Sequence, residues 1–386
     1  MTQKKKTKKL FLIFHGRFPS NKAASLFAAK SAEAFAGEGI EVELIVSRRL
    51  GREKANPYEY YKVKNIFRIV YLPVLDIPTS RFMTTVRFII SILSFSLSCS
   101  WYLLWHAKNE DIIYSNESLP LLFASLSFSK TFYEMHDFPE KNFYLFGFFL
   151  RRMRGILIHN NWKADYAKNI FGLAENKIFR EPNAVQIEEF DIQATKKEAR
   201  DKLELPPNKK IALYTGHLYS WKGADTLALA ARELSSDYLI IFVGGTPEDV
   251  NRLKHIYGNN PNILITGWKP HRDIPLWQKA ADILVLPNTG KVNISKFYTS
   301  PMKLFEYAAS KRPIVASHIP SITELVDDRA VFFVPPDDPS ELARAIERVC
   351  GDDRLSQSKS LYAYSWVREH TWQKRAGRIV SFIGLR

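Results

Sequence analysis

Cysteine is nearly absent from this chain of 386 residues: only Cys99 and Cys350 occur, far apart and in no Cys-x-x-Cys pattern. A disulfide framework and a cysteine zinc site are therefore disfavoured, and a reducing compartment fits. Acidic residues are also scarce, because 40 Asp and Glu stand against 55 Lys and Arg, which gives a formal net charge of +15. This charge favours a polyanionic partner, namely a membrane surface, a nucleic acid or a phosphorylated substrate, although it also serves solubility.

Several sequence motifs are missing as well. No G-x-x-x-x-G-K-[ST] loop occurs, and no G-x-G-x-x-G follows the first expected strand, which disfavours a P-loop enzyme and a dinucleotide dehydrogenase. No nucleic-acid-binding motif accompanies the basic charge, so we expect no nucleic-acid partner. The apolar stretch Leu10–Phe14 is interrupted at once by His15-Gly16-Arg17, so it is too short for a signal peptide.

The chain contains two runs in which apolar segments alternate with helical segments, the pattern of parallel βαβ units. A polar stretch without an apolar run follows residue 190, and we place a domain boundary there. We therefore expect an α/β protein with a first domain at 1–190, a second at 191–365 and a C-terminal helix at 366–386. The expected strands are 9–15, 41–47, 61–72, 111–115, 130–135, 155–159 and 177–181 in the first domain, and 211–215, 238–243, 262–266, 282–287, 313–316 and 330–334 in the second.

One helix of the second domain has the pattern of an anion site. Ser300 is suited to cap a helix with Pro301 at its first position, and Lys303 and Glu306 follow three residues apart on one helix face. A helix start that carries an ammonium group favours an anion, whereas the carboxylate one turn later suits a sugar hydroxyl. Together they indicate a nucleotide or a nucleotide sugar. An ordinary capped helix with a solvated ion pair remains the alternative.

A second loop points the same way. The first strand of the second domain ends in a loop from Gly216 to Gly223, which carries Lys222 just before a helix. Small residues let backbone amides approach a phosphate, and Lys222 supplies a point charge. Lys222 and Lys303 would then lie at two strand ends of one sheet, where ligands of doubly wound sheets bind.

With these motifs, the second half resembles the retaining nucleotide-sugar glycosyltransferases of the GT-B architecture, group 1 or family 4. The first half matches more loosely, through 133–137 and 181–190. The resemblance implies two Rossmann-like doubly wound domains facing each other across a cleft. The first would bind the acceptor, the second the donor, and the C-terminal helix would return to the first. Five features match in family order: Gly216…Lys222-Gly223, Val243-Gly244-Gly245, Ile265-Thr266-Gly267, the segment 281–287, and Ser300-Pro301-x-Lys303-x-x-Glu306-Tyr307.

The resemblance also implies roles for single residues. Lys222 and the helix start at Lys303 would hold the donor diphosphate, and Glu306 would bind the donor ribose. His136, with Asp137, would lie against the transferred sugar, although a structural histidine at a strand end is the alternative. The sequence has no Asp-x-Asp, the pattern expected where a metal bridges the diphosphate, so we expect neither a metal nor a cofactor. From the motifs and the resemblance we expect the donor-binding residues to be Gly216, His217, Lys222, Gly244, Trp268, Lys269, Ser300, Pro301, Lys303, Leu304 and Glu306.

Three positions depart from the family pattern. Tyr298 stands where the family often has a glutamate, and His217 stands where it usually has an arginine, so its charge is less assured. Lys311 replaces an expected glycine after the helix, which would cost about 1 kcal/mol if that residue adopts a positive φ. Tyr298 and His217 keep one alternative open, a same-fold sugar-nucleotide epimerase or an inactive nucleotide-sugar-binding protein.

Two apolar segments bear on location. Residues 88–105 carry no charge and approach the length of a spanning helix, but serines interrupt them, so we expect a packed or surface-dipping helix. Residues 143–150 are rich in phenylalanine and precede Arg151, Arg152 and Arg154, which suits an anionic headgroup layer. Burial in the core would explain the phenylalanines alone.

We therefore expect a cytoplasmic enzyme bound peripherally to the inner face of the membrane. It would be a hexosyltransferase that moves a sugar from a UDP- or GDP-linked donor to a glycan or a lipid-linked acceptor.

Overall fold

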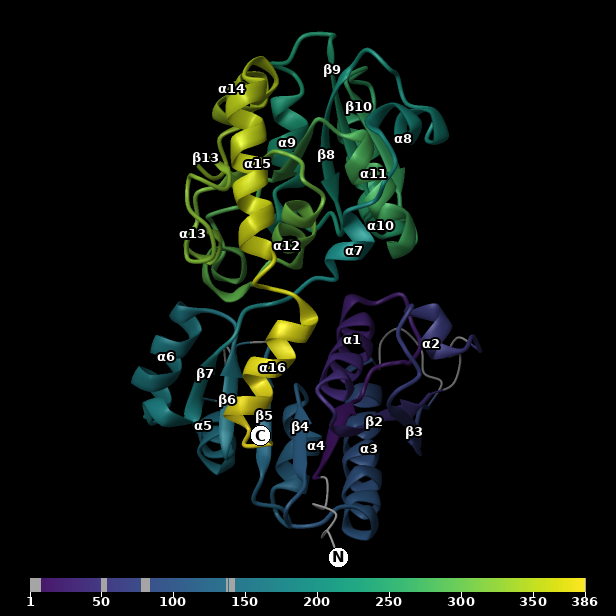
Figure 1. Cartoon of the computed structure of the whole chain (residues 1–386), viewed down its shortest axis with the longest axis vertical. Coiled ribbons are helices and arrows are strands. Elements are labelled where there is room, and N and C mark those ends of the chain that lie inside the picture. Colours follow the sequence, from purple (N-terminus) through teal and green to yellow (C-terminus); the bar gives the residue numbers. More distant parts are fainter. Residues whose placement is uncertain (1–7, 50–53, 78–83, 137, 139–142, 386) are drawn as a thin grey trace, which may run out of the picture. The chain divides into compact units, whose positions relative to one another are not determined.

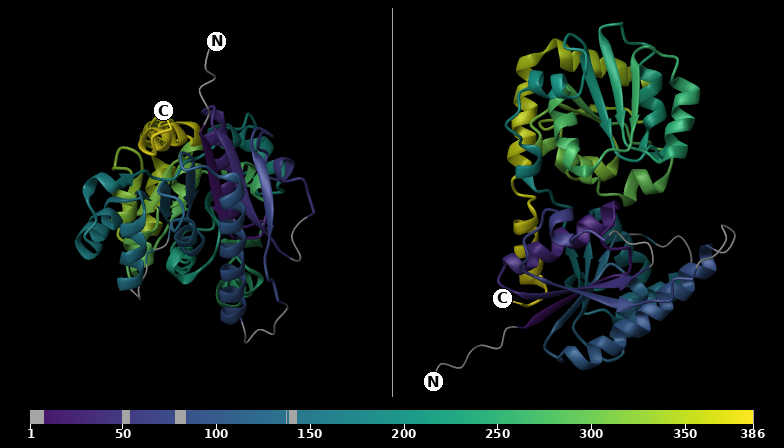
Figure 2. Two further views of the ribbon diagram at one scale, coloured as in Figure 1. Left: turned by 90° about the horizontal axis from the view of Figure 1, so that it is seen from below. Right: turned by 90° about the vertical axis from the view of Figure 1, so that its right-hand side faces the viewer.

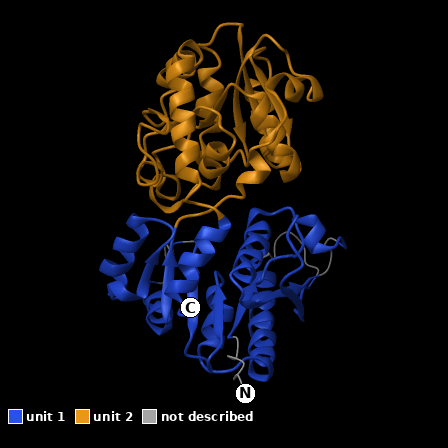
Figure 3. Cartoon of the chain, in the orientation of Figure 1, with its two compact units in different colours: residues 1–181, 372–386 blue, residues 182–371 orange. Residues whose placement is uncertain are grey.

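The computed structural model describes residues 8–49, 54–77, 84–136, 138 and 143–385. The chain divides into two compact units, each with its own parallel sheet (Figure 3). Unit 1 comprises 1–181 and 372–386, and unit 2 comprises 182–371. The predicted fold class, two Rossmann-like α/β domains, is confirmed.

Unit 1 is built on a seven-stranded sheet in the order β3-β2-β1-β4-β5-β6-β7, with every pair parallel. Its interior strand β1 is an almost unbroken apolar run, KLFLIF, which suits a strand covered on both faces. The strands are β1 (Lys9–Phe14), β2 (Glu41–Arg48), β3 (Arg68–Pro73), β4 (Ile112–Ser115), β5 (Thr131–Met135), β6 (Gly155–Ile158) and β7 (Ile178–Arg180).

Helices cover both faces of this sheet. Helix α16 packs along α1 on one face, while α3 packs against α4 on the other, as the right-hand view of Figure 2 shows. The helices of unit 1 are α1 (Ala23–Gly37), α2 (Pro57–Tyr60), α3 (Thr84–His106), α4 (Ser118–Ala124), α5 (Phe143–Arg152), α6 (Asn161–Phe171) and α16 (Trp372–Phe382). Because α16 belongs to unit 1, the expected return of a C-terminal helix to the first domain is observed.

Unit 2 has a six-stranded parallel sheet in the order β10-β9-β8-β11-β12-β13 (Figure 1). Its strands are β8 (Lys210–Thr215), β9 (Tyr238–Val243), β10 (Ile263–Gly267), β11 (Ile283–Leu286), β12 (Ile314–Ser317) and β13 (Phe332–Val334). Its helices are α7 (Ile187–Phe190), α8 (Lys196–Lys202), α9 (Ala224–Ala230), α10 (Pro247–Tyr257), α11 (Ile274–Ala280), α12 (Met302–Ala309), α13 (Pro320–Thr323), α14 (Pro339–Gly351) and α15 (Asp353–Val367).

Most strand boundaries lie within one or two residues of the expectation, and larger differences concern the strand before α3, the C-terminal helix and the domain boundary. The strand expected at 61–72 begins only at Arg68, because Tyr61 ends the short helix α2. The helix expected from residue 366 is interrupted, since α15 ends at Val367 and α16 begins at Trp372. The division between the units falls at 181/182 rather than 190/191, because Val185, Ile187 and Phe190 are buried in the core of unit 2.

Candidate active site

The candidate site of unit 2 lies at the carboxyl end of β8, where the strand order of the sheet reverses between β9 and β11. Lys303, in the first turn of α12, extends its Nζ to 3.8 Å from the centre of the Tyr214 ring on β8. This Nζ is buried and has no hydrogen-bond acceptor within the described residues. A buried ammonium without an acceptor is costly, so this geometry calls for an anion.

Electrostatics agree with this interpretation. Burial, together with the nearby charge of Lys222, holds the pKa of Lys303 well below its usual value, while Glu306 opposes the shift. Burial alone lowers the pKa of Lys222 to about 8, so this side chain is largely protonated at neutral pH. The two ammonium groups thus lie close enough to repel each other, and a bound diphosphate would relieve both.

Two glycines make room for Lys303. Gly216 follows β8 with φ of 112°, and a Cβ there would lie 2.4 Å from Lys303 Cε and 2.6 Å from its Nζ. Gly244 follows β9 with φ of 123°, and a Cβ there would lie 2.3 Å from the carbonyl oxygen of Gly216. Larger residues at either position would therefore disturb the place that the lysine occupies.

The start of α12 differs from the expectation. Pro301, not Ser300, is the N-cap residue, and no side chain caps the helix. The Ser300 hydroxyl is buried without a hydrogen-bond partner among the described residues, while its carbonyl accepts from Asn183 Nδ2 at 2.7 Å. The predicted capping role of Ser300 is therefore wrong, because the helix begins one residue later than the Ser-Pro pattern suggests. The first-turn amides are consequently left without a side-chain cap.

Glu306 has a partner that sequence reasoning missed. His271 Nε2 lies 3.5 Å from Glu306 Oε1, and the His271 ring also packs edge-on against Phe190 at 5.8 Å. This contact ties the loop after β10 to the face of α12 that carries Glu306. No local pattern marks His271, because only the tertiary fold brings it to the carboxylate.

The remaining donor-binding candidates have more varied surroundings. Leu304 is fully buried in the core, so its part is to fix α12. His217 is exposed and stacks on Tyr219 at 4.9 Å. Trp268 is 54% exposed at the end of β10, and Lys269 Nζ lies 6.0 Å from the Trp277 ring on the neighbouring helix α11. The donor-binding role of these four residues stays a prediction.

The structure shows the local conformation at two positions that depart from the family pattern, Tyr298 and Lys311. Tyr298 ends the single π-helical turn at Ile294–Tyr298, just before α12. Lys311 has φ of 57°, so a lysine occupies the left-handed conformation that the missing glycine would adopt without strain. Its ammonium group is held by Asp191 at 2.7 Å, away from the Lys303 pocket.

In unit 1, His136 directly follows β5, and its backbone carbonyl accepts a 2.6 Å hydrogen bond from the buried Lys163. Its Nε2 lies 3.2 Å from Glu134 Oε1. Asp137, its predicted partner, lies outside the described residues. Glu134 and His136 are two positions apart at the end of β5, and the chain turns there, since the His136 amide donates to the Glu134 carbonyl at 3.1 Å. Alternation along a regular strand does not predict the contact of their side chains.

Glu134, His136 and His159 offer three possible metal ligands whose atoms lie within 4.8 Å of one another. The Arg375 guanidinium already forms an ion pair with Glu134 Oε1, however, so a positive charge already stands beside this carboxylate. The donor set therefore fits a cation poorly.

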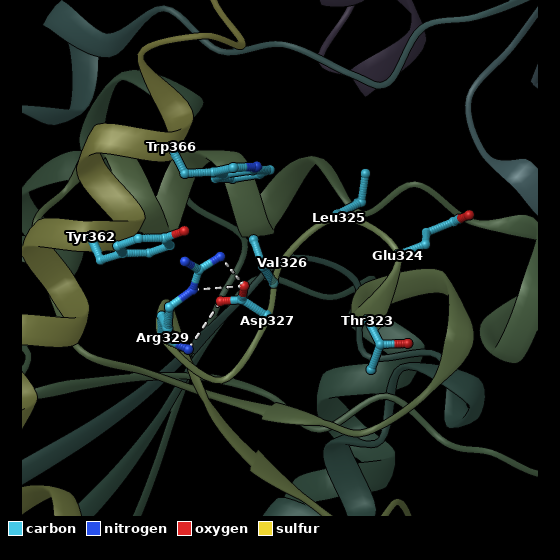
Figure 4. Close-up of a pocket in the computed structure, with 8 residues that line it drawn as sticks. All are labelled: Thr323, Glu324, Leu325, Val326, Asp327, Arg329, Tyr362 and Trp366. Atoms are coloured by element: carbon cyan, nitrogen blue, oxygen red, sulfur yellow. Dashed lines mark hydrogen bonds and ion pairs between the residues drawn. The ribbon is translucent and has the colours of Figure 1, made fainter.

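A separate cavity of about 280 Å³ opens in unit 2 beside α15 (Figure 4). Arg329 lies within it, paired with Asp327 at 2.5 Å and 4.7 Å from the Tyr362 ring. It contains none of the predicted site residues. The lining residues are Thr323, Glu324, Leu325, Val326, Asp327, Arg329, Tyr362 and Trp366.

Comparisons with known proteins fit this geometry. Residues 209–352 match the family of glycosyl transferases group 1. The chain is 28% identical over 178 residues to an alpha-D-kanosaminyltransferase of Streptomyces kanamyceticus, covering 45% of this chain and 44% of that protein. It is 26% identical over 170 residues to the putative teichuronic acid biosynthesis glycosyltransferase TuaC of Bacillus subtilis, covering 43% and 40%. These matches span less than half the length of either relative.

Similarity to solved structures extends over the whole chain. The structure of Anabaena HepE in complex with UDP and glucose superposes with a TM-score of 0.75 at 16% identity, covering 98% of this chain and 99% of that one. At this identity the likeness concerns the fold. Residues 209–352 are therefore similar to the glycosyl transferases group 1 family, and the chain has the two-domain GT-B fold seen in solved glycosyltransferases.

Proposed function

We propose that this protein is a retaining glycosyltransferase that moves a sugar from a UDP- or GDP-linked donor to a glycan or lipid-linked acceptor. The observation that carries the proposal is the buried Lys303 Nζ, which lacks an acceptor within the described chain and lies at the switch point of the unit 2 sheet. The group 1 match over 209–352 and the complex of the structural neighbour HepE with UDP and glucose support it.

Each residue of the donor site has a chemical part in this reaction. The departing nucleoside diphosphate gains negative charge, which Lys222, Lys303 and the uncapped amides of α12 stabilise. Glu306, held near His271, accepts a hydrogen bond from a donor hydroxyl. We assign His136 the contact with the transferred sugar, as the resemblance implies, and we name no protein nucleophile. Two lysines and a helix terminus supply the positive charge, so we propose that no metal is required.

The test is a panel of radiolabelled UDP- and GDP-sugars incubated with the full chain in the presence of EDTA. We expect one donor to be hydrolysed or transferred, with UDP or GDP raising the melting temperature. Absence of both turnover and thermal shift with every donor would overturn the proposal. Nucleotide binding with the donor left intact would favour the inactive binding protein, and conversion of the donor sugar would favour the epimerase, the alternatives that Tyr298 and His217 keep open.

Replacing Gly216 with alanine tests the lysine pocket directly. The new Cβ would collide with Lys303 at 2.4 Å, and the φ of 112° adds strain. We expect UDP or GDP affinity to fall about tenfold or more, because the displaced Lys303 ammonium would lose its contact with the diphosphate, and a hydrogen bond to a charged group is worth roughly 1.5–3 kcal/mol. Gly351→Ala is the matched control, since a Cβ at that position meets nothing within 4 Å. Equal affinities of the two variants, measured by calorimetry, would contradict the prediction.

We also propose that unit 1 binds the inner face of the membrane peripherally. Helix α3 is long and apolar enough to span a membrane by length and composition, but one side of it is buried through Phe95, Cys99 and Leu103. The opposite side is exposed and apolar, and it borders a groove of about 710 Å³ next to the edge strand β3. This exposed side consists of Val86, Ile89, Leu93, Leu97, Trp101, Leu104 and Trp105.

Helix α5 adds a second exposed apolar group to unit 1. Tyr144, Leu145 and Phe148 are 93%, 74% and 55% exposed, while Phe149 and Leu150 are buried, so core packing accounts for only part of this segment. Such side chains beside arginines favour the boundary between headgroups and acyl chains of an anionic bilayer.

Flotation with liposomes tests this location. We expect the protein to float with vesicles that contain phosphatidylglycerol, and the double variant W101Q/W105Q to lose most of this binding, because two exposed indoles leave the lipid face. Leu264→Gln, an exposed apolar residue of unit 2, serves as control. Failure of the parent protein to float with either anionic or neutral vesicles would remove the proposal.

A further inference from the structure

A buried polar network lies directly behind His136 in unit 1. Glu134 is its centre and is 1% exposed. Its Oε1 accepts from His159 Nε2 at 2.8 Å and from Arg375 of α16, and its Oε2 accepts from the Tyr114 hydroxyl at 2.5 Å. Three elements besides β5 thus contribute a donor to one carboxylate: β4, the turn after β6, and α16.

The His136 ring is confined on two sides. Phe27 meets it edge-on with ring centres 4.7 Å apart, and His159 meets it at the same distance. Phe27 in turn contacts Trp372 at 5.1 Å and carries the Arg375 guanidinium 5.2 Å from its ring centre. Helix α16 therefore supports His136 both through Glu134 and through Phe27.

The His136 ring faces Glu134 through its Nε2. This nitrogen is buried and lies 3.2 Å from Glu134 Oε1, although it forms no hydrogen bond among the described residues. The His136 side chain as a whole is 26% exposed. Hydrogen bonds of reacting groups are often poorly aligned before a substrate binds, so a 3.2 Å separation is within reach of alignment.

The charges of the network agree with this geometry. Burial by itself would raise the pKa of Glu134, but Arg375 and the two histidines outweigh it and hold that pKa well below its usual value, so the carboxylate is ionised. Burial lowers the pKa of His159 to about 3, against the opposing hydrogen bond to Glu134, so His159 is neutral. An ionised carboxylate facing Nε2 favours a hydrogen on that nitrogen.

We propose that Glu134, itself held by Arg375, is a positioning residue that fixes His136 as the Nε2–H tautomer and leaves Nδ1 unprotonated. In this tautomer Nδ1 accepts a hydrogen bond from a substrate hydroxyl. The catalytic consequence rests on the proposed glycosyl transfer, whereas the tautomer itself does not. A carboxylate that orients an imidazole in this way supports the reaction without touching the substrate.

The experiment measures the tautomer by long-range ¹H–¹⁵N correlation spectra of the ¹⁵N-histidine-labelled full chain at alkaline pH. His136→Asn identifies the cross-peaks of His136 by their loss. In the parent protein we expect the Nε2–H pattern. The test variant is E134Q/R375M, which removes both charges together and so avoids leaving one of them buried alone. We expect the pattern to shift toward Nδ1–H or a mixture. Lys374→Met, an exposed residue of the same helix, should leave it unchanged.

Activity is the second readout. We expect E134Q/R375M to lower kcat/KM about 10–100-fold with unaltered UDP or GDP affinity, since orienting groups have effects of this size. An Nδ1–H pattern in the parent, or an unchanged pattern in the variant, overturns the proposal. Failure of the parent to transfer any sugar overturns the proposed function instead, while the spectra still decide the tautomer.

Discussion

Replacing Lys303 with methionine is expected to lower kcat by about 10²–10³-fold, because one preorganised group that faces the leaving diphosphate is removed. The stability of the fold should not decrease. The Nζ of Lys303 is buried without an acceptor among the described residues, so methionine, which has a similar length and no charge, removes an unfavourable group. The melting temperature of the free variant should equal or exceed that of the parent. Reduced activity at undiminished stability would separate a binding role from a structural one.

The role of Lys303 should also be measurable as proton uptake when the nucleotide binds. Burial and Lys222 hold the pKa of Lys303 well below its usual value, so the free side chain holds its proton less tightly than an exposed lysine does. A bound diphosphate favours the protonated form, and UDP or GDP binding should therefore take up a proton. Calorimetry in two buffers of different ionisation enthalpy measures this uptake. Above pH 8, where free Lys222 also loses its proton, affinity should fall as the pH rises.

The matched control for this substitution is Lys254→Met, an exposed lysine of α10 in the same unit. It removes one charge from unit 2 without touching the β8 loop or α12. Proton uptake and activity should match those of the parent. If K303M bound UDP or GDP with the parent's affinity and the parent's proton uptake, the phosphate assignment of Lys303 would be wrong.

Replacing Arg375 with alanine is expected to destabilise unit 1 by about 3–5 kcal/mol. The guanidinium is 2% exposed and is the ion-pair partner of the buried Glu134 carboxylate, which would be left without its counter-charge. For a unit of this size the melting temperature should fall by about 10 °C, since each kcal/mol is worth roughly 2–4 °C. Differential scanning calorimetry measures the change.

Two further variants define the origin of that loss. Lys374→Ala, exposed on the same helix, should stay within about 0.5 kcal/mol of the parent. R375A/E134Q should recover part of the stability, because the unpaired carboxylate is gone. A melting temperature of R375A close to that of K374A would mean that the ion pair contributes little.

Periodicity and composition predicted most of the sheet elements in both units. Apolar runs such as that of β1 are bounded by polar residues, so strands buried on both faces stand out. The break between α15 and α16 could not be predicted in the same way. Between the two helices His370 and Thr371 pair with Val185, a residue far earlier in the chain, and no local pattern marks this contact.

In the candidate site, too, local sequence patterns could be predicted, whereas contacts between distant segments could not. The spacing of Lys303 and Glu306 and the glycines at 216 and 244 are local patterns, and the structure brings Gly216, Gly244 and Lys303 together. His271 beside Glu306, and Arg375 beside Glu134, are contacts between distant segments that no local pattern marks. The prediction that Ser300 caps α12 was wrong, because a Ser-Pro sequence is compatible with a helix that begins at either of two residues.

Unit 1 is built from two segments that are far apart in the chain, and this affects the order in which the units can fold during synthesis. Residues 182–371, which form unit 2, are continuous, whereas α16 leaves the ribosome only after all of them. Until then the nascent Glu134 carboxylate lacks its guanidinium and the β-sheet of 8–181 lacks the helix that packs along α1. We therefore expect unit 2 to complete its folding before unit 1. Unit 1 should depend on chaperones that bind it until translation finishes.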